Sequence, residues 1–331
     1  TLLDEHDAVI YCGGSETPRP AGIGGADFNG VYDAMPYLVQ QNRRVGRENI
    51  DSIGWPADPI LAGGKHVVVV GGGDTASDCV GTAFRQGAVK VTQLDIRPMP
   101  PEKEDKLAVW PFWATKMRTS SSQAEGAIRE FQVATLEFVG EDGVLTGVKC
   151  CQVDDRRKPI AGTEFIIKAD LAFIAIGFSG PFTNSVIKDL GDKLTLNTDR
   201  RGSTNVVANE RDYKTSVDKL WTAGDVRRGQ SLVVWAIRDG REAAAAAYVE
   251  ANARRGDIDH VLATIDTFAR EQSMLVNVGD EKGQLLESAL IRANPSRILE
   301  LGTYCGYSAL LMARTVPDAH VFTVELSADN A

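Results

Sequence analysis

A run of four valines that leads directly into a glycine-rich turn constrains the fold of this chain more than any other stretch. The sequence KHVVVVGGGDTASD occupies residues 65–78, and consecutive apolar residues between polar neighbours are typical of a strand buried on both faces. The residues after the valines fit the spacing G-x-G-x-x-A at Gly71, Gly73 and Ala76. A strand, a glycine turn and a helix in this order predict part of a parallel α/β sheet.

The spacing of small residues in this turn is typical of a dinucleotide-binding site. Gly71 would permit the tight turn, Gly73 would let the backbone approach a pyrophosphate, and Ala76 would let the helix pack closely on the strand. Unpaired amides at the helix N-terminus would then hold the anion. The predicted nucleotide-binding residues of the turn are Gly71, Gly72, Gly73, Asp74, Thr75 and Ala76. A glycine-rich turn that binds no ligand is the alternative.

An acidic residue stands where the ribose of a dinucleotide would lie. Asp95 is near the end of a second expected strand, Lys90–Ile96, and follows Ala76 by 19 residues. A carboxylate here would accept hydrogen bonds from the 2′ and 3′ hydroxyls of NADH and would repel the 2′-phosphate of NADPH. Arg97, two residues later, would suit NADPH instead. We therefore expect NADH as the coenzyme, with NADPH as the alternative.

Composition and charge argue against several classes of function. The 331 residues are 43% hydrophobic and 24% charged, which is ordinary for a globular protein. A net charge of −9 argues against a nucleic-acid partner, because such binding needs clustered Lys and Arg. Five cysteines without a C-x-x-C pair and only four histidines argue against a metal site and fit a reducing cytoplasm. The chain has no apolar run of about 18 residues, so we expect no membrane span and a cytoplasmic location.

Two further segments combine a short strand with a glycine turn. The first runs from an apolar strand into Gly13 and Gly14, and the second runs through Gly224 and Asp225 into an alanine-rich helix. Asp225 could accept a hydrogen bond from a ribityl hydroxyl of a flavin, and amides of the helix N-terminus could face the pyrimidine edge of the flavin. The amides in question belong to Val234, Trp235 and Ala236. A surface carboxylate before an ordinary amphipathic helix is the alternative.

The region between the nucleotide turn and the second of these segments contains strands of two kinds. Residues 131–139, 144–153 and 164–168 alternate apolar and polar side chains and predict an antiparallel meander. Residues 169–177, ADLAFIAIG, form a continuous apolar run that predicts a return strand of the parallel sheet. Gly177 would end this strand in a turn where two domains meet.

Three motifs occur in order along the first three quarters of the chain, VVVVGGGDTASDCVGTAFRQGA, AIGFSGP and TAGDVRRGQSLVVWAIRDGREAA. Together they resemble the small (beta) subunit of glutamate synthase over about residues 1–247. This resemblance implies an FAD-binding domain interrupted by an NAD(P)H-binding domain, with hydride transfer from the nicotinamide to N5 of the flavin. It also implies electron transfer to iron–sulfur centres and to a large partner subunit, which forms glutamate from glutamine and 2-oxoglutarate.

The same resemblance sets expectations for what the chain lacks. The cysteine-rich iron–sulfur domain and the first G-x-G-x-x-G of that family would precede the residues present here. We therefore expect an upstream part to be missing and FAD to lack its main anion site. Hydride transfer requires two rings aligned with reacting atoms roughly 3–3.5 Å apart and needs no acid or base side chain, so no catalytic residue is assigned.

A second resemblance begins near Tyr248. Residues 298–301 predict a strand, residues 307–314 a helix and residues 321–326 a second strand. The segment is similar to the start of a catechol O-methyltransferase-like enzyme that uses S-adenosylmethionine. The resemblance implies a pocket for this cofactor formed by Val278, Gly279, Glu300, Gly302, Tyr304, Ser308 and Glu325. The metal ligands and lysine base of that family would lie beyond Ala331, so we expect no methyl transfer.

The expected fold is therefore α/β, a Rossmann-like two-dinucleotide-binding flavoprotein followed by a truncated Rossmann-like methyltransferase segment. We predict a partial FAD-binding domain and connection at 1–58, an NAD(P)H-binding domain with an antiparallel insert at 59–180, the C-terminal part of the FAD-binding domain at 181–247 and a methyltransferase fragment at 248–331. The leading function is hydride transfer from NAD(P)H to FAD. An S-adenosylmethionine-dependent methyltransferase and a non-catalytic interaction polypeptide are the alternatives.

Overall fold

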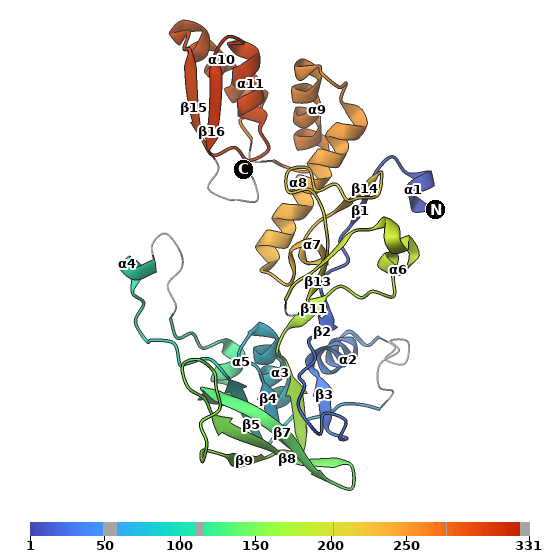
Figure 1. Ribbon diagram of the computed structural model, residues 1–331, viewed down its shortest axis with the longest axis vertical. Coiled ribbons are helices and arrows are strands. Elements are labelled where there is room, and N and C mark those ends of the chain that lie inside the picture. The colour runs from blue at the N-terminus through green and yellow to red at the C-terminus, as the bar shows by residue number, and fades with distance from the viewer. Residues whose placement is uncertain (49–57, 110–115, 201, 276, 325–331) are drawn as a thin grey trace. The chain divides into compact units, whose positions relative to one another are not determined.

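The computed structural model describes residues 1–48, 58–109, 116–200, 202–275 and 277–324, and the chain divides into two compact units (Figure 1). One unit is continuous in sequence, Pro18–Gly177, and is called the inserted unit. The other combines Thr1–Thr17 with Phe178–Ala331 and is called the split unit. The sequence-based boundaries at 58 and 180 differ from these, because the structure groups residues 18–48 with the inserted unit.

A five-stranded parallel sheet forms the centre of the inserted unit, in the order β3-β10-β4-β5-β6. Its strands are β3 (Val31–Asp33), β4 (His66–Val70), β5 (Lys90–Asp95), β6 (Ile128–Phe131) and β10 (Leu171–Ile174). The four valines form β4 in the middle of this sheet, and Val67, Val68 and Val69 are at most 1% exposed. The structure thus confirms the predicted strand that is buried on both faces.

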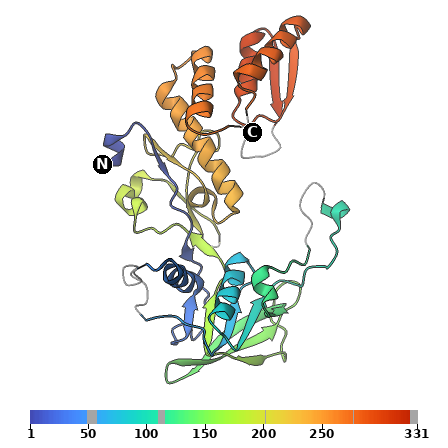
Figure 2. The same ribbon diagram turned by 180° about the vertical axis from the view of Figure 1, so that it is seen from behind.

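Helices cover one face of the sheet and a second, antiparallel sheet covers the other (Figures 1 and 2). The covering helices are α2 (Ala34–Gly46), α3 (Asp74–Arg85) and α5 (Ser121–Ala124), whereas the short α4 (Lys106–Val109) projects away from the sheet. The antiparallel sheet consists of β7 (Val133–Glu141), β8 (Val144–Gln152) and β9 (Phe165–Lys168), which confirms the predicted meander. Successive side chains of a strand point to opposite faces, so Val67 and Val69 join the core under the helices while Val68 and Val70 join the core under the meander.

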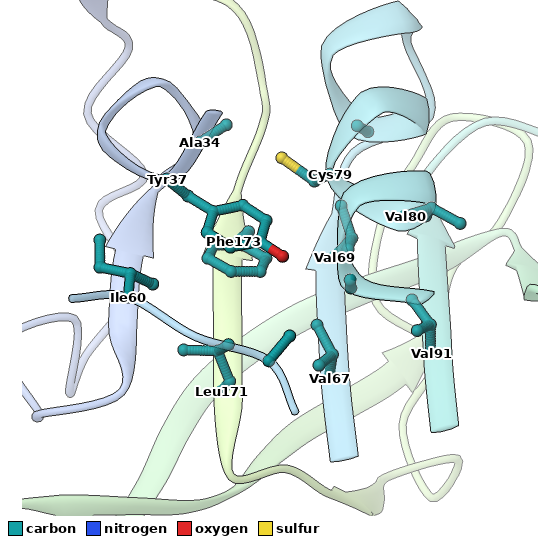
Figure 3. Close-up of a cluster of buried hydrophobic side chains, with 13 residues drawn as sticks. Ala34, Tyr37, Ile60, Val67, Val69, Cys79, Val80, Val91, Leu171 and Phe173 are labelled. Carbon is teal, nitrogen blue, oxygen red and sulfur yellow. The ribbon is translucent and has the colours of Figure 1, made fainter. Parts of the chain in front are cut away.

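The segment around β3 lies in the part predicted as partial FAD-binding domain and connection, 1–58, and it supplies both an edge strand and a helix of the inserted unit. Tyr37 on α2 stacks on Phe173 of β10, with ring centroids 4.0 Å apart and both side chains fully buried. Figure 3 shows the two rings between Ala34 and Val69 in this core. The stacked rings anchor α2, the helix that directly follows β3, on β10, the strand with which β3 pairs.

The split unit contains several small sheets and a long helix. Strand β1 (Val9–Tyr11) pairs in parallel with β14 (Leu220–Thr222), and β12 (Leu196–Thr198) pairs antiparallel with β13 (Thr204–Val206). The remaining elements before residue 253 are α1 (Leu2–Glu5), β2 (Thr17–Pro18), β11 (Phe178–Gly180), α6 (Val186–Leu190), the 3-10 helix Gly191–Lys193, α7 (Asp225–Arg228) and α8 (Val233–Asn252). Helix α8 begins one residue after Leu232, as the alanine-rich sequence predicted.

The last part of the split unit has the predicted strand-turn-helix-strand order. Its elements are α9 (Ile258–Glu271), α10 (Gly279–Ala293), β15 (Arg297–Leu301), α11 (Tyr307–Thr315) and β16 (His320–Val324), with β15 and β16 paired in parallel. Ala245 of α8 shares a buried cluster with Phe268 of α9 and Tyr307 of α11. The helices of this segment therefore pack onto the second half of α8.

Candidate dinucleotide-binding site

The turn between β4 and α3 begins at Gly71, a residue that must be glycine in this conformation. Its φ is +135°, which side chains rarely tolerate, and a Cβ on Gly71 would lie 2.2 Å from the carbonyl oxygen of Ala175. The Gly71 amide also donates to the carbonyl of Leu94 on β5, at 2.9 Å. The turn is therefore held tightly between the two strands that flank β4.

The first turn of α3 provides unpaired amides next to open space. Gly73 is the N-cap residue, and its carbonyl accepts from the amide of Ser77 at 3.0 Å. The amides of Asp74, Thr75 and Ala76 precede the first intrahelical donor and have no partner within the helix. A Cβ built on Gly73 would meet nothing within 4 Å, so the space beside these amides is open. A pyrophosphate fits this arrangement, because the helix dipole and the amides both favour an anion.

Ala76 has the packing role that the sequence predicted. Its side chain is fully buried in the core between α3 and the sheet. A larger residue would force the helix away from β4 and would move the amides of the first turn.

Asp95 and Arg97 form an ion pair at the carboxyl end of β5. The guanidinium Nη2 of Arg97 lies 2.8 Å from Oδ2 of Asp95, and Nε lies 3.0 Å from Oδ1. The backbone amide of Arg97 also donates to Oδ1, at 2.9 Å. These hydrogen bonds raise the pKa of the Arg97 guanidinium above its ordinary value. Both oxygens of the carboxylate thus accept from Arg97.

Gly72 leaves room for this ion pair. A Cβ on Gly72 would lie 1.8 Å from Oδ2 of Asp95 and 2.8 Å from Nη2 of Arg97. The same Nη2 donates to the carbonyl of Gly72 at 3.1 Å. The middle glycine of the turn is therefore required by the residues at the end of β5.

Two buried glutamines that were not predicted as site residues form a hydrogen-bonded chain to the backbone of the turn. Gln93 of β5 donates from Nε2 to the carbonyl of Gly71 at 3.0 Å, and Gln123 of α5 donates to Oε1 of Gln93 at 2.8 Å. Both side chains are buried, so each amide needs a partner. The sequence KVTQLD of β5 mixes polar and apolar residues, so it did not single out Gln93.

The expected flavin-contacting glycines lie at the ends of two paired strands of the split unit. Gly13 and Gly14 follow β1, and Gly224 follows β14, with Tyr11 opposite Thr222 in the register. Gly14 and Gly224 both have positive φ, at +69° and +75°. Parallel strands end at one edge of their sheet, so the structure brings these predicted residues together.

Two aspartates, Asp225 and Asp239, accept hydrogen bonds from different parts of the segment that follows β14. Oδ1 of Asp225 accepts from the hydroxyl of Ser231 at 2.8 Å, while buried Asp239 of α8 accepts from the amide of Gly224 at 3.2 Å. Asp239 also pairs with Arg228 at 2.7 Å and with Arg227 at 3.2 Å. Asp239 was not singled out from the sequence, and it fixes the Gly224 turn against α8.

The N-terminus of α8 differs in detail from the expectation. The amides of Trp235 and Ala236 both donate to the carbonyl of Leu232, at 2.9 and 3.3 Å. The amides without an intrahelical partner in this turn are those of Val233 and Val234, so Val234 alone remains from the predicted set. The side chains of Val233 and Val234 are exposed and give this helix end an apolar surface.

Gly177 is the last residue of the inserted unit. Its φ is +95°, and its carbonyl accepts from the amide of Arg19 at 3.0 Å. It follows Ala175, the residue that contacts the Gly71 turn, by two positions. The return strand, predicted over 169–177, is β10 and ends at Ile174, and Gly177 lies between β10 and β11.

The second predicted cofactor pocket lies on β15, the following turn and α11. The hydroxyl of Ser308 donates to Oε1 of Glu300, and Oε2 of Glu300 is buried without a hydrogen-bond partner in the described part of the chain. Gly302 and Tyr304, in the turn between β15 and α11, both have positive φ. The remaining predicted residues are Val278 and Gly279 at the start of α10 and Glu325, which lies outside the described residues. Four of the predicted residues thus belong to one strand-turn-helix.

The residues that the structure describes show neither a metal cluster nor a membrane-spanning helix. They contain no group of three or more His, Cys, Asp or Glu side chains that could hold a metal ion. None of their helices has the length and apolar character that a bilayer crossing requires.

A parallel sheet with an open glycine turn at a helix N-terminus is the arrangement of dinucleotide-binding α/β proteins. The chain belongs to the pyridine nucleotide-disulphide oxidoreductase family, whose sequence profile matches residues 3–240. This family implies FAD and NAD(P)H as cofactors. A profile described as O-methyltransferase matches residues 258–331 and implies S-adenosylmethionine for that segment.

Individual relatives agree with this division. A glutamate synthase [NADPH] small chain of Mycobacterium tuberculosis is 42% identical over 249 residues, which are 74% of this chain and 49% of the relative. The chain thus spans about half the length of the curated relatives it matches. A probable O-methyltransferase of the same species is 63% identical over 95 residues, 29% of this chain and 41% of that protein. Among solved structures, a T. acidophilum thioredoxin reductase aligns with a TM-score of 0.47 and 23% identity, over 73% of this chain and 65% of that chain.

Proposed function

We propose that residues 1–247 are the reductase part of a glutamate-synthase small-chain type of oxidoreductase, in which hydride passes from NAD(P)H to FAD. The observation that carries this proposal is the open first turn of α3, where unpaired amides adjoin Gly73 at the end of the buried strand β4. NAD(P)H would bind within the inserted unit, Pro18–Gly177, which contains nearly all of the predicted NAD(P)H-binding domain, 59–180.

The residues of this chain bind and orient, and none needs to transfer a proton. The amides of Asp74, Thr75 and Ala76 would hold the pyrophosphate, and the Gly71 turn fixes where the helix begins. FAD, when bound, supplies a two-electron acceptor that can release electrons singly. Gly224, Asp225 and the first turn of α8 would hold its ribityl and ring portions, since this helix end presents unpaired amides and an apolar surface. Alignment of the two rings is the main requirement of hydride transfer.

We infer the overall reaction and the partner proteins from the relatives of this chain. Glutamate synthase small chains of M. tuberculosis and Bacillus subtilis are named for NADPH, and the glutamate synthases of two yeasts for NADH. By this relationship the electrons would pass to an iron–sulfur acceptor or a large subunit, which would form glutamate from glutamine and 2-oxoglutarate. The cytoplasm is the compartment we propose, on the cysteine pattern of the sequence.

Titration of the purified chain with NADPH and NADH tests the proposal. The expected result is binding of at least one of them to the parent and a loss of at least about tenfold in Gly73→Val, because hydrogen bonds to a charged group are worth about 1.5–3 kcal/mol. Gly24→Val is the matched control, since a Cβ on Gly24 makes only ordinary contact, 3.8 Å from Glu137. Equal affinity in all three proteins would refute the nucleotide assignment.

A second candidate function, binding of S-adenosylmethionine by the last segment, rests on Glu300. A buried carboxylate oxygen without a partner calls for a hydrogen-bond donor, and ribose hydroxyls are such donors. Calorimetric titration with S-adenosylmethionine should show binding that Glu300→Gln weakens. If neither this ligand nor a nicotinamide nucleotide binds, the chain is an interaction polypeptide.

A further inference from the structure

We propose that a pocket between helix α8 and the last segment of the chain binds an organic cation, an amine attached to an apolar body. The pocket has a volume of about 670 Å³, and its lining residues all belong to the split unit. None of the described residues that line it belongs to the nucleotide turn or to the candidate flavin turn. Binding at this pocket is therefore independent of the function proposed for residues 1–247.

The walls of this pocket come from two segments that have different relatives. One part of the lining comes from the second half of α8 and from the loop between β13 and β14, which contribute Val249 and Tyr213. The other part comes from α9 and from the turn between β15 and α11, which contribute Ile265 and Cys305. Tyr213 lies in the part that matches the oxidoreductase profile, whereas Ile265 and Cys305 lie in the part that matches the O-methyltransferase profile. The pocket is therefore a property of this combined chain and of neither family alone.

The pocket differs from the S-adenosylmethionine site that the last segment is expected to form. Among the described residues assigned to that cofactor, Tyr304 alone also lines the pocket. Glu300 and Ser308, which hydrogen-bond to each other, do not line it. An occupant would therefore lie beside the turn after β15 and away from the carboxylate proposed to hold a ribose.

Apolar side chains form the most buried part of the pocket. Ala245 of α8, Ile265 of α9 and Leu275 after α9 are each at most 7% exposed. Partly buried apolar side chains extend this surface, those of Ala246, Val249, Val261 and Leu310. The volume of about 670 Å³ is within the range of about 300–1,000 Å³ that is typical of small-molecule sites. Contact with these side chains would remove the apolar body of a ligand from water, which favours binding.

Acidic side chains dominate the polar part of the pocket. Four carboxylates and one guanidinium line it, those of Glu210, Asp212, Glu242, Glu250 and Arg211. Arg238 pairs with Glu242 at 2.8 Å and neutralises part of this charge. Lys214 pairs with Glu250 and neutralises another part. Among the described residues the carboxylates still outnumber these cations by four to three, so the pocket attracts a positive charge.

Glu242 is the carboxylate best placed to hold an ammonium group, because its side chain is 11% exposed. Its Oε1 accepts from Nε of Arg238 at 2.8 Å, and its Oε2 accepts from the hydroxyl of Tyr213. Each carboxylate oxygen has two lone pairs, so both oxygens can accept a further hydrogen bond, and an ammonium group donates without accepting. The pKa of the Cys305 thiol is raised by burial and further by the negative charge of Glu242, which agrees with a negative potential at this wall. An amine with an apolar body therefore matches both parts of the lining, and an acid of the same shape does not.

The test compares tryptamine with indole-3-propionate, which share an indole ring and a two-carbon chain and differ in the charge at its end. Calorimetric titration of the full chain should give a dissociation constant at least about tenfold lower for the amine than for the acid, because like charges brought together at a binding site are costly. Ala246→Phe should fill the pocket and weaken tryptamine binding at least about tenfold. Ala263→Phe is the matched control, since Ala263 is an exposed residue of α9 that does not line the pocket.

Charge variants test the preference for a cation separately from the shape of the pocket. Glu242→Gln keeps the shape, removes the charge and should reduce the preference for tryptamine at least about threefold. Glu250→Gln should do the same, and because the Glu250 side chain is 44% exposed, this variant keeps the test valid if Glu242→Gln fails to fold. Glu271→Gln, at the exposed end of α9 and outside the pocket, should leave both dissociation constants unchanged.

Cys305 reports occupancy of the pocket directly, because its partly buried side chain belongs to the lining. Saturating tryptamine should slow the alkylation of Cys305 by iodoacetamide at about pH 9 at least about fivefold, as measured by peptide mass spectrometry. Cys12 is exposed and lies outside the pocket, so its rate in the same samples should not change. Indole-3-propionate at the same concentration should protect neither cysteine.

Binding of tryptamine that Ala246→Phe removes and Ala263→Phe retains, together with protection of Cys305, would support the inference. Absence of tryptamine binding, equal affinity for the amine and the acid, or an unchanged Cys305 rate would overturn it. Competition between tryptamine and S-adenosylmethionine that Glu300→Gln removes would also overturn it, since that result would assign the pocket to the cofactor of the last segment.

Discussion

The carbonyl oxygen of Ala175, just beyond β10, lies 2.2 Å from where a Cβ on Gly71 would be. Residues separated by more than a hundred positions in sequence thus determine together that the nucleotide turn begins with glycine. Gly71 and Gly73 belong to the same motif, yet a Cβ on Gly73 would meet nothing within 4 Å. The first glycine is therefore required by the fold and the second is available to a ligand.

Gly71→Ala should destabilise the inserted unit by about 3 kcal/mol, because a residue with a side chain is strained at a φ of +135° and the methyl group would collide with Ala175. Urea unfolding followed by circular dichroism measures the change. Gly24→Ala, with an ordinary 3.8 Å contact, should shift the midpoint little. A parent-like midpoint for Gly71→Ala would contradict the geometry of the turn.

Phe173→Ala should cost about 3–5 kcal/mol of the free energy of unfolding, since it removes a fully buried ring and leaves Tyr37 without its stacking partner. Phe173→Leu keeps most of the volume and should cost less. The same urea experiment ranks the two variants. An equal cost for both would show that the site collapses around the missing ring.

The valine run, the meander and the start of α8 could be predicted because their signals are local. The apolar run Val67–Val70 predicts a buried strand by composition alone, and Gly71 predicts the turn that follows it. Strand β3 was missed because Val31–Asp33 is too short to show a period of two, and its place in the sheet depends on a helix that packs through Tyr37. Edge strands of three residues are fixed by tertiary contacts.

The polar part of the site was harder to foresee than the backbone. The sequence places Arg97 two residues after Asp95, and only the folded turn shows that the guanidinium covers the carboxylate and reaches Gly72. Asp239 follows Gly224 by 15 residues and looks like any acidic residue on a helix. Its role appears only when α8 packs against the turn and brings it to the Gly224 amide.

Asp239→Ala should destabilise the split unit by about 3–5 kcal/mol, because it leaves Arg227 and Arg228 largely buried without their shared counter-charge. Trp235 fluorescence should report the loss, since the Arg228 guanidinium lies over its ring at 5.7 Å from the centroid. Asp218→Ala is the control, because the Asp218 side chain is 87% exposed. Similar stability of both variants would show that the arginines find other partners.

Thiol reactivity should separate the cysteines by burial. Burial raises the pKa of all three of Cys12, Cys79 and Cys150, that of Cys150 to about 12, but Cys12 is exposed to solvent while Cys79 and Cys150 are buried. Iodoacetamide at about pH 8.5, near the pKa of an unfolded thiol, should therefore modify Cys12 first and leave Cys79 and Cys150 unmodified until the chain unfolds. Peptide mass spectrometry after timed alkylation measures the order.

The same raised pKa makes stability depend on pH in the alkaline range. The folded chain keeps the Cys150 proton up to about pH 12, while the unfolded chain releases it above about pH 8.5. The unfolded state therefore binds fewer protons in this interval, and the stabilising contribution present below about pH 8.5 is lost as pH rises toward 12. Cys150→Ala should unfold in urea with a shallower dependence on pH from 8.5 upward than the parent, as measured on matched samples at each pH. A parent and a variant with parallel pH profiles would show that Cys150 ionises as easily in the folded chain as in the unfolded one.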